Sequence, residues 1–396
     1  MSKVKDYLLF CPGPVNINQN IWQALTYHIG HREEEFSELL TRINQKILDI
    51  FEIRQHAKYY PLLVTGSGTA ANETVLSSFE KKQRVLVLCN GEFGERLYTI
   101  SKLYNSKTYK LAFQWAEQID IKKVEKQLQS RKVDIIVMVH HETSTGMLNP
   151  VSEIGKLTRK YNIDFFVDAI SSATAERIDI EKWNITFCTT TSGKAISSLP
   201  GIGIIISKVS SLEELKQNTK RNIYLNLYNL YHYSKTVKQT PNTPAVHLFA
   251  ALDQALSNIV TVGVQQNRKI ILERAFFLRD RMKKLGFIFL LDESKGNTMS
   301  SVLTTVMLPS HLSADYLKQK LKDRRIVIYN GKGPLLDRVF QVANIGNLTK
   351  HDLIYFLNSL EQINHEAKDT HLSFSAPQKR FSFLTNAFHL HLHRSK

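Results

Sequence analysis

Short apolar runs alternate with longer amphipathic stretches in the chain up to about residue 257. The apolar runs are rich in β-branched residues and predict buried parallel strands at residues 85–88, 135–139 and 165–167, with further strands at 62–64 and 202–206. Amphipathic stretches at residues 36–51 and 151–161 predict helices between these strands. Alternation of this kind is typical of an α/β fold in which helices cover both faces of a mainly parallel sheet. Ligands in such sheets bind at the carboxyl ends of the strands.

The pattern changes at about residue 258, where a long helical stretch begins and runs through Arg268 and Leu278 to Leu285. Strands are then predicted at residues 302–308 and 326–329, and helices at residues 314–323 and 350–362. We therefore expect an N-terminal segment (1–20), a large domain (21–257), a smaller C-terminal α/β domain (258–364) and a tail (365–396).

Composition is that of an ordinary globular protein, with 396 residues, 43% hydrophobic and 22% charged. The sequence has no apolar stretch of membrane-spanning length and no apolar leader near its start, so no membrane association is expected. The three cysteines, Cys11, Cys89 and Cys188, are widely spaced. They indicate a reduced cytoplasm, without structural disulfides or a zinc site.

The formal net charge of +16 raises nucleic-acid or membrane-surface binding as a rival interpretation. The basic residues are, however, scattered through helix-like stretches such as residues 121–126 and 316–322. Residues in such stretches usually form a solvated helix face, so no nucleic-acid partner is expected. The charge can still attract anionic substrates.

The tail contains five of the 14 histidines, including His389, His391 and His393. We expect a disordered or loosely docked segment there, and metal binding by the histidines is the alternative.

Two residues, Asp168 and Lys194, carry the main chemical signal. Asp168 ends the apolar run at residues 165–167, and Lys194 follows it in the sequence Thr191-Ser192-Gly193-Lys194. A lone lysine is usually a surface residue, and an aspartate after an apolar run is usually a cap or turn residue. Together they match the needs of a pyridoxal phosphate enzyme, in which a lysine forms a Schiff base and a carboxylate keeps the pyridine nitrogen protonated.

A small-residue turn precedes this pair. The strand at residues 62–64 runs into Thr65-Gly66-Ser67-Gly68-Thr69 and then into a predicted helix. Such a turn alone is more often a plain connection, and it lacks the lysine of a nucleotide P-loop and the spacing of a dinucleotide motif. Followed by Asp168 and Lys194, it predicts a phosphate site at the positive end of a helix.

With these motifs the chain resembles class V aminotransferases of pyridoxal phosphate fold type I, and within them the 2-aminoethylphosphonate:pyruvate aminotransferases. The matching stretches extend through most of the chain: residues 12–14, 66–69, 90–96, 140–150, 167–172, 194–203 and 344–346. The most specific of them is His140-His141-Glu142-Thr143-Ser144-Thr145-Gly146-Met147-Leu148-Asn149-Pro150. The resemblance implies a large domain with a mainly parallel seven-stranded sheet and a smaller C-terminal α/β domain.

The resemblance also implies roles for residues around the cofactor ring. Phe93 matches the aromatic residue that stacks on the ring, and Thr143 matches the hydroxyl residue that binds its phenolic oxygen. A core phenylalanine and a structural turn hydroxyl are the alternatives. Lys194 and Asp168 would be the catalytic residues.

Other residues are implied to hold the cofactor's phosphate, namely Ser67, Gly68, Thr69 and Ser192. Thr243 matches the threonine that reaches the phosphate of the neighbouring subunit, which implies a homodimer with shared active sites. Otherwise Thr243 is a helix N-cap.

The implied reaction transfers an amino group from a small amine to a 2-oxo acid such as pyruvate. Lys194, desolvated and so lowered in pKa, would shuttle the proton, and the two substrates would react in turn with ping-pong kinetics.

The chain departs from the family where it reads Phe340-Gln341-Val342-Ala343-Asn344. Gln341 replaces the arginine that grips the substrate's acidic group in the family. Loss of that contact predicts about ten- to a hundredfold weaker affinity unless another cation serves. Arg32 and Arg338 are the candidates by sequence context, and a surface ion pair is the alternative role for each.

Three functions stay open at this point. The first is the 2-aminoethylphosphonate type of aminotransferase. The second is another class V enzyme, such as an alanine or serine transaminase toward glyoxylate or a pyridoxal phosphate lyase, in which Gln341 suits a different substrate. The third is a binding or assembly component without turnover, against which the joint presence of Asp168 and Lys194 argues.

Overall fold

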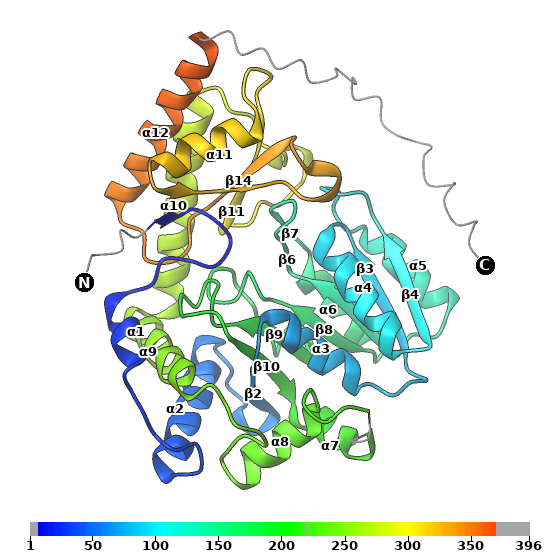
Figure 1. Cartoon of the computed structure of the whole chain (residues 1–396). Helices are drawn as coiled ribbons and strands as arrows, with labels where there is room; N and C mark the ends of the chain where they lie inside the picture. Colours follow the sequence, from blue (N-terminus) through cyan, green and yellow to red (C-terminus); the bar gives the residue numbers. More distant parts are fainter. Residues whose placement is uncertain (1–6, 219–220, 370–396) are drawn as a thin grey trace, which may run out of the picture.

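A sheet of seven strands is the centre of the computed structural model, which describes residues 7–218 and 221–369 (Figure 1). The order across the sheet is β2 (Tyr59–Thr65), β10 (Ile202–Lys208), β9 (Phe187–Thr191), β8 (Asp164–Asp168), β5 (Ile135–Val139), β3 (Arg84–Cys89) and β4 (Lys107–Ala112). Only β10 runs against its neighbours, and the other pairs are parallel. The strands predicted up to residue 257 and the mainly parallel sheet are confirmed. The single strand predicted at residues 326–329 is wrong, because β12 (Ile326–Val327) and β13 (Tyr329–Asn330) are separate strands in different sheets.

Both faces of this sheet are covered because successive side chains of a strand point to opposite sides. On β5, Ile136 and Met138 join one hydrophobic core, whereas Ile135 and Val137 join the other. The first core is completed by α1 (Gln19–Ala24), α2 (Glu34–Ile50), α5 (Ile121–Ser130), α6 (Val151–Lys160) and α9 (Val246–Val262). The second is completed by α3 (Gly68–Ser78), α4 (Glu92–Tyr104), α7 (Val209–Glu214) and α8 (Leu227–Thr236). Strands buried on both faces account for the uninterrupted apolar runs of the sequence.

A third core lies in the C-terminal part of the chain. Its elements are α10 (Val264–Lys284), β11 (Leu303–Met307), α11 (Ala314–Asp323), β12 (Ile326–Val327), β13 (Tyr329–Asn330), β14 (Val339–Ala343) and α12 (Lys350–Asp369). β14 is the central strand of a three-stranded antiparallel sheet with β11 and β13. Figure 1 shows these elements above one edge of the large sheet.

The long helical stretch expected from about residue 258 is two helices. α9 ends at Val262 and α10 begins at Val264, with Gly263 between them at φ 85°. A positive φ suits glycine and interrupts the helix. The apolar periodicity continues on both sides of Gly263, so periodicity alone does not reveal the break.

The N-terminal segment packs against the C-terminal part of the chain. β1 (Leu8–Leu9) pairs in parallel with β12, and Phe10 is fully buried in the third core, stacked on Phe356 at 4.5 Å between ring centroids. The remaining short elements are the hairpin strands β6 (His141–Glu142) and β7 (Met147–Leu148) and the 3₁₀ helices η1 (His56–Lys58), η2 (Leu215–Asn218), η3 (Glu293–Lys295) and η4 (Gly333–Leu335).

Within residues 7–218 and 221–369, no helix combines the length and apolarity that crossing a membrane requires. The histidines at 389–393 lie outside the described residues. The division into domains at residues 20, 257 and 364 stays a prediction.

Replacing Phe10 by alanine should lower the free energy of unfolding by about 3–5 kcal/mol, because it empties a fully buried aromatic site. Denaturant unfolding at constant m-value measures the change. Phe276→Ala is the matched control, since that ring is 56% exposed on α10. Equal losses in the two variants would contradict the assignment of Phe10 to the core.

Candidate active site

The carboxyl ends of β2, β5, β8 and β9 meet at one edge of the large sheet, and a cavity of about 280 Å³ lies there. Its lining includes seven of the residues predicted from the sequence, Ser67, Gly68, Thr69, Phe93, Thr143, Asp168 and Lys194. They come from five places in the chain, and the parallel strands bring them together because all of these strands end on the same side.

Asp168 is the last residue of β8, and its carboxyl group is buried under the cavity. Asn72 Nδ2 donates to Oδ2 at 2.7 Å, and the Ile170 backbone N–H donates to Oδ1 at 2.9 Å. Burial raises the pKa of Asp168 to about 6, and these two hydrogen bonds limit the rise. An ionised carboxylate is thus costly here and gains from a cationic partner.

Lys194 lies in the loop between β9 and β10. Burial lowers the pKa of its amine. Gly13 packs directly against it: a Cβ at Gly13 would lie 2.6 Å from Lys194 Nζ, and φ at Gly13 is +141°. Any larger residue at this position would displace the amine. Ser192 Oγ donates to the Leu199 carbonyl at 2.6 Å and closes the loop that presents Lys194.

The predicted phosphate turn connects β2 to α3. Gly66 donates its N–H to the Gly201 carbonyl at 2.7 Å, and α3 begins at Gly68 with no side-chain capping bond from Ser67. The first N–H groups of a helix have no intrahelical partner and carry positive partial charge. A Cβ at Gly68 would lie 2.7 Å from Ile170, so glycine is required for the helix to approach β8 this closely. The turn can therefore receive an anion.

A buried carboxylate in the β6–β7 hairpin positions Phe93. Glu142 accepts hydrogen bonds from the backbone N–H of Phe93 at 3.3 Å and of Gly94 at 3.0 Å, in the first turn of α4. Ser144 Oγ donates to the same carboxyl group at 2.5 Å. An acidic group at a helix N-terminus is stabilised by the helix dipole, although burial raises the pKa of Glu142. The hairpin that carries Thr143 thereby fixes the aromatic residue opposite.

Two cations contact the Phe93 ring. Arg96 Cζ lies 4.8 Å from the ring centroid and Lys332 Nζ lies 5.1 Å from it, both within cation–π range. Arg96 is one helical turn beyond Phe93 on α4 and lines the cavity.

Gln341 is on β14 and is buried outside the cavity lining. Its Nε2 lies 2.7 Å from the Thr143 carbonyl, 3.3 Å from the Ser144 carbonyl and 3.4 Å from Thr305 Oγ1. The amide therefore supports the turn that presents Thr143. Arg338, just before β14, is exposed and also lies outside the lining.

Arg32 and Thr243 belong to one surface region, away from this chain's own cavity lining. The Arg32 guanidinium donates to Gln239 Oε1 and to the Thr240 carbonyl, both at 2.9 Å. Thr243 is exposed in the loop that Arg32 holds. The alternative role of Thr243 as a helix N-cap is wrong, because the N-cap of α9 is Ala245.

Sequence reasoning missed several residues of the cavity lining, among them Asn72, His141 and Arg96. Asn72 connects Asp168 to Thr189, whose Oγ1 donates to Asn72 Oδ1 at 2.6 Å. His141 lines the cavity, and its Nε2 is buried without a hydrogen-bond partner among the described residues. Burial lowers the pKa of His141 to about 3, so the ring is neutral. Asn72 lies one helical turn from the phosphate turn, and that spacing was the available signal.

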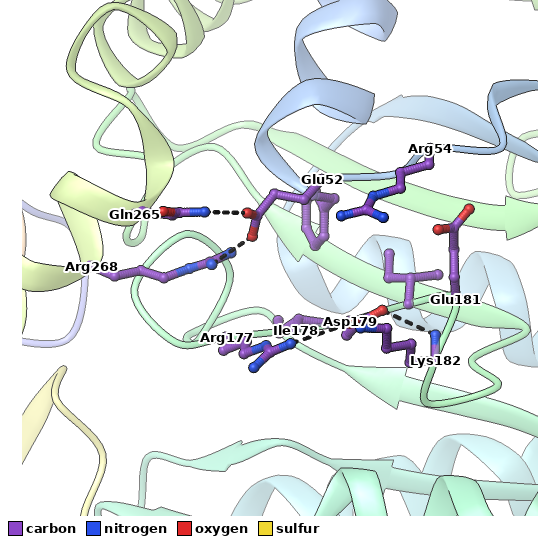
Figure 2. A pocket seen from close by; sticks show the side chains of 11 residues that line it. Glu52, Arg54, Arg177, Ile178, Asp179, Glu181, Lys182, Gln265 and Arg268 are labelled. Atoms are coloured by element: carbon purple, nitrogen blue, oxygen red, sulfur yellow. Dashed lines mark hydrogen bonds and ion pairs between the residues drawn. The ribbon is translucent and has the colours of Figure 1, made fainter.

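A second cavity, of about 500 Å³, is larger and lies elsewhere in the structure (Figure 2). Several of its charged groups form ion pairs: Glu52 accepts from Arg268 at 2.6 Å, and Asp179 lies 3.5 Å from Arg177. Glu52 also accepts from Gln265 at 3.1 Å. None of the predicted site residues lines it.

Comparison with known proteins agrees with this geometry. The family model for class-V aminotransferases matches residues 19–345. A bifunctional phosphonoacetaldehyde hydrolase/aminoethylphosphonate transaminase of Clostridioides difficile is 31% identical over 90% of this chain and 56% of that protein. A 2-aminoethylphosphonate–pyruvate transaminase of Lysinibacillus sphaericus is 28% identical over 88% of this chain and 95% of its own length. The solved structure of an alanine–glyoxylate aminotransferase from Nostoc sp. has a TM-score of 0.85 and 25% identity over 91% of this chain and 96% of that chain.

The chain belongs to the class-V aminotransferase family. The fold is the α/β fold type I of pyridoxal phosphate aminotransferases, as the sequence predicted, and the enzyme class is that of the transaminases. The chain spans only about half of the bifunctional relative.

Class-V aminotransferases use pyridoxal phosphate, and the residues of the cavity fit this group. Asp168 offers a buried carboxylate that lacks a cationic partner among its hydrogen bonds, and Lys194 offers a desolvated amine. The uncapped start of α3 suits a phosphate, and the unpartnered His141 Nε2 suits a polar ligand.

The Asp168→Asn variant should be more stable than the wild type without cofactor at pH 8, by up to about 3 kcal/mol. The folded pKa of Asp168, about 6, lies above its ordinary value of 3.8, so stability is lost as pH rises through this window. The introduced amide can donate to Asn72 Oδ1 if the Asn72 amide reverses, so the network survives. Thermal unfolding at pH 4 and pH 8 measures the effect, and the difference should vanish at pH 4. A variant that is less stable at pH 8 would contradict the cost assigned to the ionised carboxyl group.

Proposed function

We propose that the protein transfers an amino group from a small amine of the 2-aminoethylphosphonate type to a 2-oxo acid such as pyruvate, with pyridoxal phosphate as cofactor. The observation that carries the proposal is the placement of Asp168 and Lys194 in one cavity, beside a helix N-terminus that can hold a phosphate. The named activities of the C. difficile and L. sphaericus relatives support this substrate class.

When bound, pyridoxal phosphate supplies an electron sink for a bond broken at the substrate's Cα. Asp168 would hold the pyridine nitrogen, because a buried carboxylate gains from a protonated partner. Phe93 would stack on the ring and Thr143 would bind its phenolic oxygen. Ser67, Gly68 and Thr69 would hold the phosphate, and Ser192 would assist through the loop that it closes.

Lys194 would move the proton of the reaction. Burial lowers the pKa of its amine, so the neutral form that can accept a proton is more accessible than for a surface lysine. One amine in one cavity serves both substrates, so they react in turn and ping-pong kinetics follow.

A second candidate function has an observation of its own. The N–H groups of Gln341 are used on the Thr143 and Ser144 carbonyls, so this position offers no charge to an acidic substrate. Another class V activity, such as an alanine or serine transaminase toward glyoxylate or a lyase, is therefore the alternative. The Nostoc structure is named for such a transaminase. Absorbance changes on adding candidate amines distinguish these activities, since only a transaminase converts the cofactor to the pyridoxamine form.

A homodimer is part of the proposal. Thr243 is exposed and outside its own chain's cavity lining, as a residue serving a partner's phosphate must be. Arg32 would act through this loop, since it holds residues 239–241 by three hydrogen bonds.

Borohydride reduction of the cofactor-loaded protein should attach the cofactor to Lys194 alone. Peptide mapping by mass spectrometry identifies the labelled lysine. Lys194→Ala should abolish labelling and lower the transamination rate by orders of magnitude, because both the attachment point and the proton carrier are lost. Label on Lys332, whose ammonium lies 5.1 Å from the Phe93 centroid, would contradict the assignment.

Thr243→Ala should weaken cofactor binding about tenfold, the cost of one hydrogen bond to a charged group, with Thr236→Ala as the exposed control. A hybrid dimer of a Lys194→Ala chain and a Thr243→Ala chain identifies the site that Thr243 serves. If it serves the partner, the hybrid's intact Lys194 receives an intact Thr243 and binds cofactor at wild-type affinity, measured by fluorescence titration. Weak binding in the hybrid, or full cofactor affinity in a monomer, would contradict the shared site.

A further inference from the structure

The position that carries an arginine in similar aminotransferases cannot hold an acidic substrate here. Gln341 Nε2 has two N–H groups, and its contacts are with the Thr143 and Ser144 carbonyls and with Thr305 Oγ1. Gln341 is also 3% exposed, and no charge is present at this position. An anion brought out of water needs a cation or several donors, so another residue must supply them.

The same small sheet presents a cation from a neighbouring turn. Tyr329 of β13 lies opposite Gln341 of β14, and the chain then turns through Gly331, Lys332 and Gly333 into η4. A Cβ at Gly331 would lie 2.1 Å from the Leu335 carbonyl oxygen, and one at Gly333 would lie 2.9 Å from the Trp115 ring. Both flanking residues must therefore be glycine, and the close packing on either side fixes the place of Lys332.

Lys332 lies beside a residue of the active site. Its ammonium lies 5.1 Å from the centroid of Phe93, a residue of the cavity lining. Lysines such as Lys110 and Lys160 form ion pairs at 2.9 and 2.7 Å. Lys332, in contrast, has no ion pair with any carboxylate of the described part of the chain. It is an exposed cation without a counter-ion at the edge of the site.

Arg96 is the other cation at Phe93, and two features distinguish it from Lys332. Arg96 lies 3.8 Å from Glu92 in its own helix, so part of its charge is already compensated. Arg96 also lines the cavity, whereas Lys332 lies outside that lining, with its ammonium 5.1 Å from the Phe93 centroid.

We propose that Lys332, held by the Gly331–Gly333 turn, supplies the positive charge that binds the acidic group of the amino donor. This inference rests on the proposed aminotransferase function and names the specificity residue of that site. It accounts for the loss of arginine at position 341, because the charge is moved to the adjacent turn of the same sheet. Lys332 also helps to lower the pKa of the Lys194 amine, and a bound anion would neutralise that influence.

The test compares an acidic and a neutral amine of similar size, 2-aminoethylphosphonate and n-butylamine, in the half-reaction that forms the pyridoxamine cofactor. Lys332→Gln should lower kcat/KM for 2-aminoethylphosphonate about ten- to a hundredfold, mainly through KM, because one charge-assisted contact is lost. The rate with n-butylamine should fall much less than tenfold, because that amine has no acidic group for Lys332 to bind. Lys332→Arg should keep most of the preference, and Gln341→Arg added to Lys332→Gln should restore part of it.

Binding of ethylphosphonate, which has the acidic group but no amine, gives a readout without turnover. Calorimetry should show the same ten- to a hundredfold loss of affinity in Lys332→Gln, roughly as for one charge-assisted contact. Lys318→Gln on α11 removes an exposed lysine elsewhere and should leave both measurements unchanged.

The outcomes separate this inference from the proposed function. A wild type that converts neither amine refutes the proposed donor class, whereas ethylphosphonate binding still tests Lys332. Equal losses for both amines in Lys332→Gln would show a purely structural role and overturn the inference. A phosphonate-specific loss in Arg96→Gln but not in Lys332→Gln would overturn it as well, because the cation would then be Arg96.

Discussion

The site depends on a chain of two hydrogen bonds that runs from Thr189 through Asn72 to Asp168, at 2.6 and 2.7 Å. These three residues belong to β9, α3 and β8, the elements that present the lysine loop, the phosphate turn and the buried carboxylate. Each bond is modest, but unpaired polar groups at this depth would each cost more than the bond gains. The network therefore fixes three separate segments relative to one another before any ligand arrives.

Charge around the cavity is unbalanced, and this defines what the cavity can accept. Lys194, Arg96 and Lys332 lie around it, and the buried carboxylate of Asp168 is costly to ionise because burial raises its pKa. An anionic ligand with one protonated nitrogen would compensate the positive charge of the cations with its anionic group and the Asp168 carboxylate with its nitrogen. The free protein thus carries unfavourable electrostatic energy, and binding of a matching ligand relieves it. This is a common cost of preorganised sites.

The sequence was a good guide where the backbone decides the outcome. Strand ends and the turn after β2 follow from apolar runs and glycines, so Asp168, Gly68 and Lys194 were placed correctly beside one cavity. It was a poor guide where a side chain has a choice of partners. Ser192 directs its hydroxyl to the Leu199 carbonyl, and Gln341 contacts a carbonyl far away in the chain. The first pairing depends on the path of one loop and the second on how separate layers pack, and periodicity encodes neither. The break at Gly263 was missed because both helices keep one apolar pattern.

The pairing of β1 with β12 has a consequence for the order of assembly. Leu8 and Leu9 find their partners at Ile326 and Val327, and the residues that follow β1 bring Gly13 against Lys194. During synthesis the large sheet can form while this early segment has no strand to join. Contacts of such sequence separation form slowly, so the cavity wall at Gly13 closes only after the C-terminal sheet exists. The surroundings of Lys194 are therefore completed only after nearly the whole polypeptide has been made.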